Sequence, residues 1–168
     1  GSSDEGTIVV GVTSDLRVGV DLQSLHVVMR ASGSVVHDET LSAGSASSPL
    51  TLPTELSFTD LPGGTPVDVT IDAFRPGEAN TPLVTRRAST EILAGKKLLL
   101  RLVVDSRCIV APGSSATECA EPETCVAGAC EGEHVDAHFL KPYTPDWAGG
   151  GDICKPANAG APEVIVGE

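Results

Sequence analysis

Five cysteines are the residues of this chain whose types and spacing most clearly indicate chemistry. Cys108, Cys119, Cys125 and Cys130 lie within 23 residues, and Cys154 follows after a longer gap. Such a dense group indicates disulfide bonds and an oxidising compartment. Zinc is the competing interpretation, but the chain has no C-x2-C pair of the kind that zinc sites use. Five thiols form at most two internal disulfides, so one cysteine is left over.

Two histidines offer a second kind of chemistry. His134 and His138 are four residues apart, with Asp136 between them and Glu131 and Glu133 before them. On a helix this spacing places both rings on one face, where they could ligate zinc or copper. The zinc metalloproteases need a glutamate directly after the first histidine, and here a valine stands there. A solvated turn is the favoured alternative to a metal site.

Three of the chain's five aromatic residues follow at a spacing of four: Phe139, Tyr143 and Trp147. Pro142 and Pro145 forbid a regular helix through this spacing, so we expect an extended arm. The rings could anchor a glycan or a protein partner, because exposed aromatics supply a large contact area at low entropic cost. Alternatively they cover an open edge of the fold, which is the interpretation we favour.

The remaining motifs of catalysis are missing from the sequence. No Gly-x-Ser-x-Gly occurs, and the glycines at 149–151 lack the Lys-Ser/Thr that follows a phosphate-binding loop. We therefore expect no enzymatic activity, no catalytic residue and no cofactor.

The balance of charge excludes further classes of partner. Eleven Lys and Arg against 23 Asp and Glu give a net charge of −12. Phosphate backbones repel such a chain, so we do not expect nucleic-acid binding. No apolar run reaches the ~20 residues of a membrane-spanning helix. We interpret residues 1–6 as a flexible acidic leader, the trimmed start of a mature exported protein.

Composition and alternation predict an all-β fold. Hydrophobic residues make up 40% of the chain and are mostly Val, Leu, Ala and Ile, while 18 Gly and 12 Pro supply turns. The clearest alternation sets Val67, Val69 and Ile71 against polar neighbours. We predict an antiparallel β-sandwich of seven or eight strands. The candidate strands are residues 7–13, 25–31, 35–41, 55–61, 67–74, 83–93 and 96–105. Residues 16–22 are either a further strand or a bulged continuation of the first, and residues 49–53 are a short extended piece at an edge.

The chain divides into four parts on these grounds. The leader covers residues 1–6, the β-sandwich domain 7–105, a cysteine-rich module 106–131, and an aromatic arm with a linker 132–168. Residues 163–167 alternate like the start of a strand and could begin a further domain. We expect the run 98–104, which is apolar on both faces, to be central or to contact the cysteine-rich module.

Two stretches resemble known modules. Leu-Pro-Gly-Gly at 61–64, Val-Asp-Val-Thr-Ile-Asp-Ala at 67–73 and Ala-Gly-Lys-Lys before a leucine-rich strand resemble immunoglobulin-like and transthyretin-like sandwich modules of bacterial surface proteins. The cysteine run resembles halves of EGF-like or follistatin-like modules, although a complete EGF-like unit has more cysteines than the four here. The resemblance implies the pairs Cys108–Cys125 and Cys119–Cys130. Cys154 would then be free or bonded to another chain.

From this resemblance we expect a structural or adhesive module of an exported bacterial surface lipoprotein, with its lipid anchor upstream of residue 1. It would lie on the outer cell surface, outside the cell or in the periplasm, and contact a protein or a glycan. One alternative is a subunit of an extracellular filament, in which residues 163–167 or the N-terminal strand add to a neighbour's sheet. The other is a metal-binding accessory module that uses His134 and His138.

Overall fold

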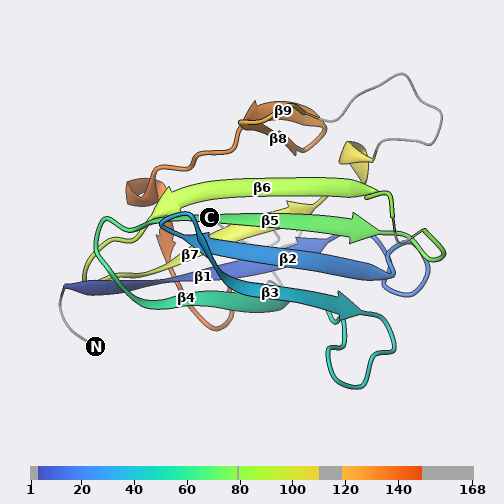
Figure 1. The fold of residues 1–168 in the computed structure, drawn as a ribbon, viewed down its shortest axis with the longest axis horizontal. Helices are drawn as coiled ribbons and strands as arrows, with labels where there is room; N and C mark the ends of the chain where they lie inside the picture. Colours follow the sequence, from blue (N-terminus) through green and yellow to red (C-terminus); the bar gives the residue numbers. More distant parts are fainter. Residues whose placement is uncertain (1–3, 79, 110–118, 149–168) are drawn as a thin grey trace, which may run out of the picture.

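Two four-stranded β-sheets pack face to face in this protein (Figure 1). The structure is a computed structural model, and it describes residues 4–78, 80–109 and 119–148. The first sheet has the strand order β10-β7-β1-β4, the second has the order β3-β2-β5-β6, and β8 and β9 form a separate hairpin. The strands are β1 Glu5–Ser14, β2 Ser24–Ala31, β3 Ser34–Ser42, β4 Thr54–Pro62, β5 Pro66–Phe74, β6 Val84–Glu91, β7 Lys97–Val104, β8 Glu123–Val126, β9 Ala129–Gly132 and β10 Lys141–Pro142. Two single-turn 3-10 helices, η1 Ser106–Cys108 and η2 Ala137–Phe139, complete the described elements.

Strand β1 is central in the first sheet. It pairs antiparallel with β4 and parallel with β7, so that Val10 lies opposite both Leu56 and Leu100. Its even-numbered residues Ile8, Val10 and Val12 point into the core between the sheets and are fully buried. The prediction of an all-β sandwich is confirmed.

The second sheet is antiparallel throughout and supplies the other half of the core. Strand β5 pairs with β2 and β6. Its residues Val67, Val69 and Ile71 are buried, whereas Asp68 and Asp72 lie on the outer face. The alternation read from the sequence therefore sets the register here, because a slip by one residue would bury both carboxylates. The predicted hairpin of residues 25–31 and 35–41 is also present, as β2 and β3.

Residues 16–22 and 49–53 are not paired strands. Residues 16–22 form a compact loop, in which the carbonyl oxygen of Arg17 accepts hydrogen bonds from the amides of Val20 and Asp21. The Asp21 carboxylate accepts from the Arg17 amide and guanidinium, and the side-chain hydrogen bond lowers the pKa of Asp21. Local side-chain bonds therefore compete successfully with strand pairing. Residues 49–53 make only an isolated bridge, between Pro49 and Ser42.

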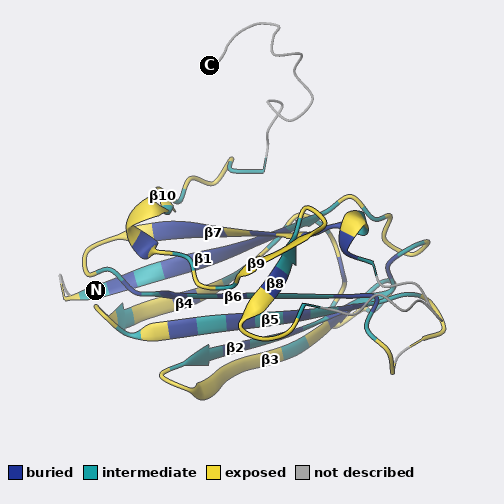
Figure 2. Cartoon of the chain, turned by 90° about the horizontal axis from the view of Figure 1, so that it is seen from above, coloured by how far each residue is buried: buried dark blue, intermediate teal, exposed yellow. Residues whose placement is uncertain are grey.

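The two lateral sides of the sandwich differ. On one side, seen face-on in Figure 2, the β8–β9 hairpin and the chain after it lie across the gap between β6 and β7. On the other side, β3 and β4 are the outermost strands of their sheets (Figure 1). Within the described residues, no helix is long and apolar enough to span a membrane.

Candidate functional site

Two disulfides fix the cysteine-rich module. They join Cys108 to Cys125 and Cys119 to Cys130, which is the pairing that the resemblance implies. Cys108 ends η1, directly after β7, so its disulfide ties that strand to the β8–β9 hairpin. Cys154 lies outside the described residues. The two bonds are consistent with an extracellular or periplasmic protein.

The module lies along the edge of β6. The Arg87 amide donates to Oγ1 of the buried Thr124 over 2.9 Å. The Ser89 amide donates to the carbonyl oxygen of Glu133 over 3.0 Å, and the Val135 amide donates to that of Ser89 over 2.8 Å. These bonds satisfy backbone groups of β6 that would otherwise face solvent. Burial here also raises the pKa of the Glu133 carboxyl.

The chain then crosses from β6 to β7 through η2. Val135, Ala137 and Leu140 pack against the main core, and Ala137 is fully buried. The Asp136 carboxylate caps η2 by accepting from the His138 amide over 2.9 Å. Phe139, between Ala137 and Leu140, points away from the protein and is 82% exposed.

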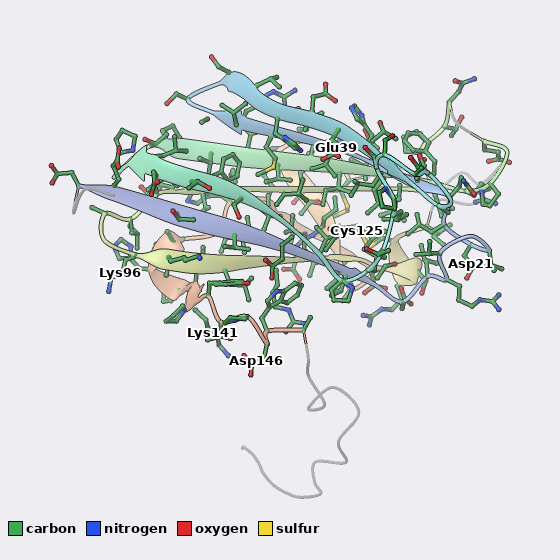
Figure 3. All side chains as sticks on the ribbon, turned by 90° about the horizontal axis from the view of Figure 1, so that it is seen from below. Asp21, Glu39, Lys96, Cys125, Lys141 and Asp146 are labelled. Carbon is green, nitrogen blue, oxygen red and sulfur yellow. A yellow bond between two sulfur atoms is a disulfide. The ribbon has the colours of Figure 1, made fainter. Side chains whose placement is uncertain are left out.

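Residues 141–148, which we call the C-terminal strap, begin as β10 at the edge of the first sheet and then pass over its outer face (Figures 2 and 3). Strand β10 pairs with Leu98 and Leu99 of β7, and the Tyr143 amide donates to the carbonyl oxygen of Lys97 over 2.9 Å. Both polar aromatic groups of the strap donate to one carboxylate on β4. The Tyr143 hydroxyl lies 2.8 Å and the Trp147 indole nitrogen 2.7 Å from Oε2 of Glu55.

Two cationic side chains of β7 also contact the aromatic rings of the strap. The Lys97 ammonium lies 4.9 Å from the centre of the Tyr143 ring, and the Arg101 guanidinium lies 5.4 Å from that of Trp147. Such contacts are favourable because the ring faces carry negative potential. The hydrogen bond to Glu55 stabilises the neutral phenol and raises the pKa of Tyr143.

The strap covers an apolar strip that faces away from the main core. Val9 and Leu99 are buried although they point to the outer face of the sheet. Beside them, a Cβ added to Gly11 would lie 2.7 Å from Cη2 and Cζ2 of Trp147. Gly11 is therefore the place where the indole meets the backbone of β1. A glycine inside a strand is the sequence signal for such a close approach, but Gly11 is not among the residues predicted above to have a role.

The structure separates the three predicted partner-binding residues. Tyr143 and Trp147 pack on their own sheet, whereas Phe139 is exposed. The extended arm predicted from Pro142 and Pro145 agrees with this course of the chain.

The two candidate metal ligands make separate contacts. His134 forms a bridge with Ser89 of β6, and its Nδ1 lies 3.3 Å from the Ser89 hydroxyl. Nδ1 of His138 lies 2.9 Å from the Asp136 carboxylate. The helix face that the metal hypothesis assumed is missing, since η2 has three residues and begins after His134. Across the described parts of the chain, no group of three or more potential ligands could hold a metal ion.

The buried polar groups have structural partners, with one exception. Asp105 is 6% exposed and caps η1, and its carboxylate accepts from Nη2 of Arg107 over 2.7 Å. This hydrogen bond lowers the pKa of Asp105. Thr90 is the exception: its hydroxyl is buried and has no hydrogen-bond partner among the described groups.

Comparisons with models of protein families, with curated proteins and with solved structures give no match for this chain. The assignment of a function therefore depends on the geometry above.

Proposed function

We propose that this protein is a non-enzymatic structural or adhesive module of an exported cell-surface protein, in which Phe139 contacts a protein or a glycan. One observation carries the proposal: Phe139 is 82% exposed while its neighbours in the chain are anchored. Large exposed aromatic side chains often mark interaction sites, because they bury much apolar area on binding.

The chain on both sides of Phe139 is anchored to the fold, and this supports a role in recognition. Ala137 and Leu140 pack in the core on either side, and the Asp136 cap fixes the turn between them. After them, β10 and the strap attach the chain to β7 and Glu55. A ring on a fixed base loses little conformational entropy on binding, which favours affinity.

Export is the second part of the proposal, with a lipid anchor upstream of residue 1 and a place at the bacterial surface. The two disulfides support export itself, since such bonds persist in oxidising compartments.

The experiment compares the wild type with Phe139→Ala on a glycan microarray and against a phage-displayed random peptide library. We expect ligands whose affinity falls about tenfold or more in the variant, as for a buried aromatic anchor. The matched control is Val20→Ala, which removes a 58% exposed side chain from the loop between β1 and β2. Ligands that bind both variants as well as the wild type would contradict the proposal, provided that both variants keep the wild-type melting temperature.

A filament subunit is the second candidate. It is favoured because no strand of the described residues pairs with the outer edge of β3 or β4. The strand predicted at 163–167 lies outside the described residues. Sedimentation velocity should then show assembly that rises with concentration and disappears when either terminus is deleted. A monomer at all concentrations would rule this candidate out.

A further inference from the structure

Cationic side chains that lack a carboxylate partner gather in one place on this acidic protein. Five arginines of the described residues form ion pairs: Arg17, Arg30, Arg75, Arg87 and Arg107. Arg86 is half-buried and interacts with Glu131. The four other lysines and arginines of the described ranges are exposed and form no ion pair there. We call them the basic strip: Lys96, Lys97, Arg101 and Lys141.

The basic strip follows β7 and its partner β10. Lys97 and Arg101 point to the outer face of the first sheet, as Leu99 between them does. Lys141 pairs with Leu99 and therefore lies on the same face, at a level between the two. Because alternate residues of a strand are about 7 Å apart, these three cations form a row with that spacing. Lys96 precedes β7, and Figure 3 shows it with Lys141 along the same margin of the molecule.

The carboxylates near the basic strip have other partners or make no ion pair with it. Glu55 lies on β4, two strands away from β7, and accepts from uncharged groups of the strap. Asp136 accepts from the amide and the ring of His138. Asp146 is on the strap, and none of the ion pairs between described residues joins it to the strip. The cations of the strip can therefore pair with anionic groups from outside.

Phe139 stands next to this strip. Leu140, which separates it from Lys141, packs against the core and has an extended backbone with φ −75° and ψ 144°. Side chains on either side of an extended residue point the same way, so the Phe139 ring and the Lys141 ammonium both face solvent. This agrees with the 82% exposure of Phe139 and with the exposure of Lys141.

Charge and spacing together indicate the class of partner. Carboxylates at alternate positions of an extended peptide also lie on one face about 7 Å apart, so they match the row of Lys97, Lys141 and Arg101. Phe139 favours a peptide over a sugar, because sugar hydroxyls need hydrogen-bond partners that a phenyl ring does not offer. An apolar side chain has no such need.

We propose that the partner of Phe139 is a protein with an extended acidic segment, whose alternate carboxylates contact the basic strip while an apolar side chain packs on the ring. This assignment rests on the proposed role of Phe139 and adds the chemistry of its partner. Complementary charge would select the segment, and the ring would supply apolar contact area.

The test is a titration of the full ¹⁵N-labelled chain, followed by NMR, with two peptides that differ only in charge. One is acetyl-Leu-Thr-Glu-Thr-Glu-Thr-Glu-amide, whose leucine and glutamates share one face when it is extended. The other has glutamine in place of each glutamate. We expect shift changes at the amides of residues 96–101 and 139–141 and a dissociation constant at least about tenfold lower for the glutamate peptide.

A third probe separates a peptide from an anionic glycan. Trigalacturonate carries three carboxylates, as the glutamate peptide does, but on sugar rings. It should bind about tenfold more weakly than the glutamate peptide, because it brings no apolar side chain to Phe139.

Variants of the strip make the result specific to its charge. Lys141→Gln should weaken the glutamate peptide about threefold, the order expected for an exposed charge pair. Adding Lys96→Gln should bring the loss to about tenfold, since separate pairs add. Neither change should affect the glutamine peptide. Arg30→Gln, the matched control, removes the same charge from β2 in the second sheet and should change neither affinity.

Phe139→Ala separates this assignment from the proposed function. It should weaken both peptides by the same factor, because it removes only the apolar contact. If it does so while the lysine variants bind like the wild type, the basic strip has no part in binding and only this assignment is wrong. If Phe139→Ala binds both peptides like the wild type, the proposed function is wrong as well.

Four further outcomes would overturn the assignment. They are equal affinity for the two peptides, tighter binding of trigalacturonate than of the glutamate peptide, and shift changes confined to residues outside 96–101 and 139–141. The fourth is a change of the same signals with protein concentration alone, which would identify a second copy of this chain as the occupant.

Discussion

Glu55 is the residue that holds both polar aromatic groups of the strap. Its carboxylate accepts from Tyr143 and Trp147 on the outer face of the first sheet. Charge-assisted hydrogen bonds of this kind are stronger than bonds between neutral groups. A single side chain thus holds the strap on the first sheet.

Thr90 gives a test of the core at the same scale. We expect Thr90→Val to raise the free energy of unfolding by about 1 kcal/mol, because a buried hydroxyl without a partner costs its desolvation. Urea denaturation measures this value. Thr124→Val is the matched control: its hydroxyl is equally buried but accepts from the Arg87 amide, so the variant should lose about 1 kcal/mol. A less stable Thr90→Val would contradict the assignment.

Asp105 predicts how stability changes with pH. Its hydrogen bond to Arg107 lowers its pKa in the folded state, so it stabilises the fold above the unfolded pKa of about 4. That contribution is lost as the pH falls through the folded pKa. We expect Asp105→Asn to cost about 1 kcal/mol at pH 7 and nothing at the acid end of a urea series, since a charged hydrogen bond is replaced by a neutral one.

Glu133 is the control, because its ionisation should affect the stability of the fold in the opposite direction. Burial raises its pKa, so its ionisation destabilises the fold at neutral pH and the penalty vanishes on acidification. Glu133→Gln should therefore be more stable than the wild type at pH 7 and equal to it in acid. The two assignments would be refuted if the effects of Asp105→Asn and Glu133→Gln on the free energy of unfolding changed with pH in the same direction.

At the scale of elements, the strap and β1 depend on each other. The strap covers Val9 and Leu99, and the absence of a side chain at Gly11 lets Trp147 approach the strand. An apolar strip on the outer face of a sheet would otherwise be exposed to solvent or to other chains. The strap is therefore part of the sandwich.

Gly11→Val should displace Trp147 and lower the free energy of unfolding by about 2 kcal/mol, the order expected when an aromatic ring loses its buried contacts. Denaturation in guanidinium measures the change. Gly132→Val adds the same atoms on β9, where the structure has open space. It should therefore lower the free energy of unfolding much less than Gly11→Val does. Equal losses in the two variants would argue against the contact.

The elements that the sequence predicted well are those with local signals. Strand β5 alternates apolar and polar residues without interruption, and β2 and β3 are joined by a tight Ser32-Gly33 turn with a glycine at φ +81°. The run 16–22 alternates as clearly but forms a loop, because Asp21 bonds back to Arg17 and no sheet covers Val18 and Val20. Alternation alone does not tell a strand from such a loop.

The contacts between segments far apart in the chain could not be predicted from the sequence. The parallel pairing of β1 with β7 and the meeting of Glu55 with Tyr143 join residues about 90 positions apart. No local pattern encodes such a distance. The prolines predict the extended arm, and covering an edge of the fold is the role favoured for its rings. The sequence does not show that β7 is the partner strand, nor that Phe139 is the exposed ring.

At the scale of the whole molecule, the two lateral sides of the sandwich have opposite characters. The disulfide-bonded module and η2 cover the side between β6 and β7, whereas no strand of the described residues pairs with the outer edge of β3 or β4. A covered edge offers fewer free backbone groups to another strand.

Removal of the disulfide between Cys108 and Cys125 tests this closure. The double alanine variant should lose about 3 kcal/mol, as is typical for such a loop. Because the module would then separate from β7, hydrogen exchange at the Arg87 and Ser89 amides should accelerate. The double alanine variant of Cys119 and Cys130 is the control, and it should affect these amides less. Unchanged exchange at both amides would show that the module does not depend on this bond.

The central claim of this account is that the strap is a folded part of the sandwich, so that Phe139 alone among these aromatics is presented to a partner. The most direct measurement is acrylamide quenching of Trp147, the only tryptophan of the chain. The indole packs over Gly11 between Arg101 and Glu55. Its emission should therefore be blue-shifted, and it should be clearly less quenched in the native protein than in guanidinium. Emission and quenching equal to those of the unfolded chain would contradict the claim.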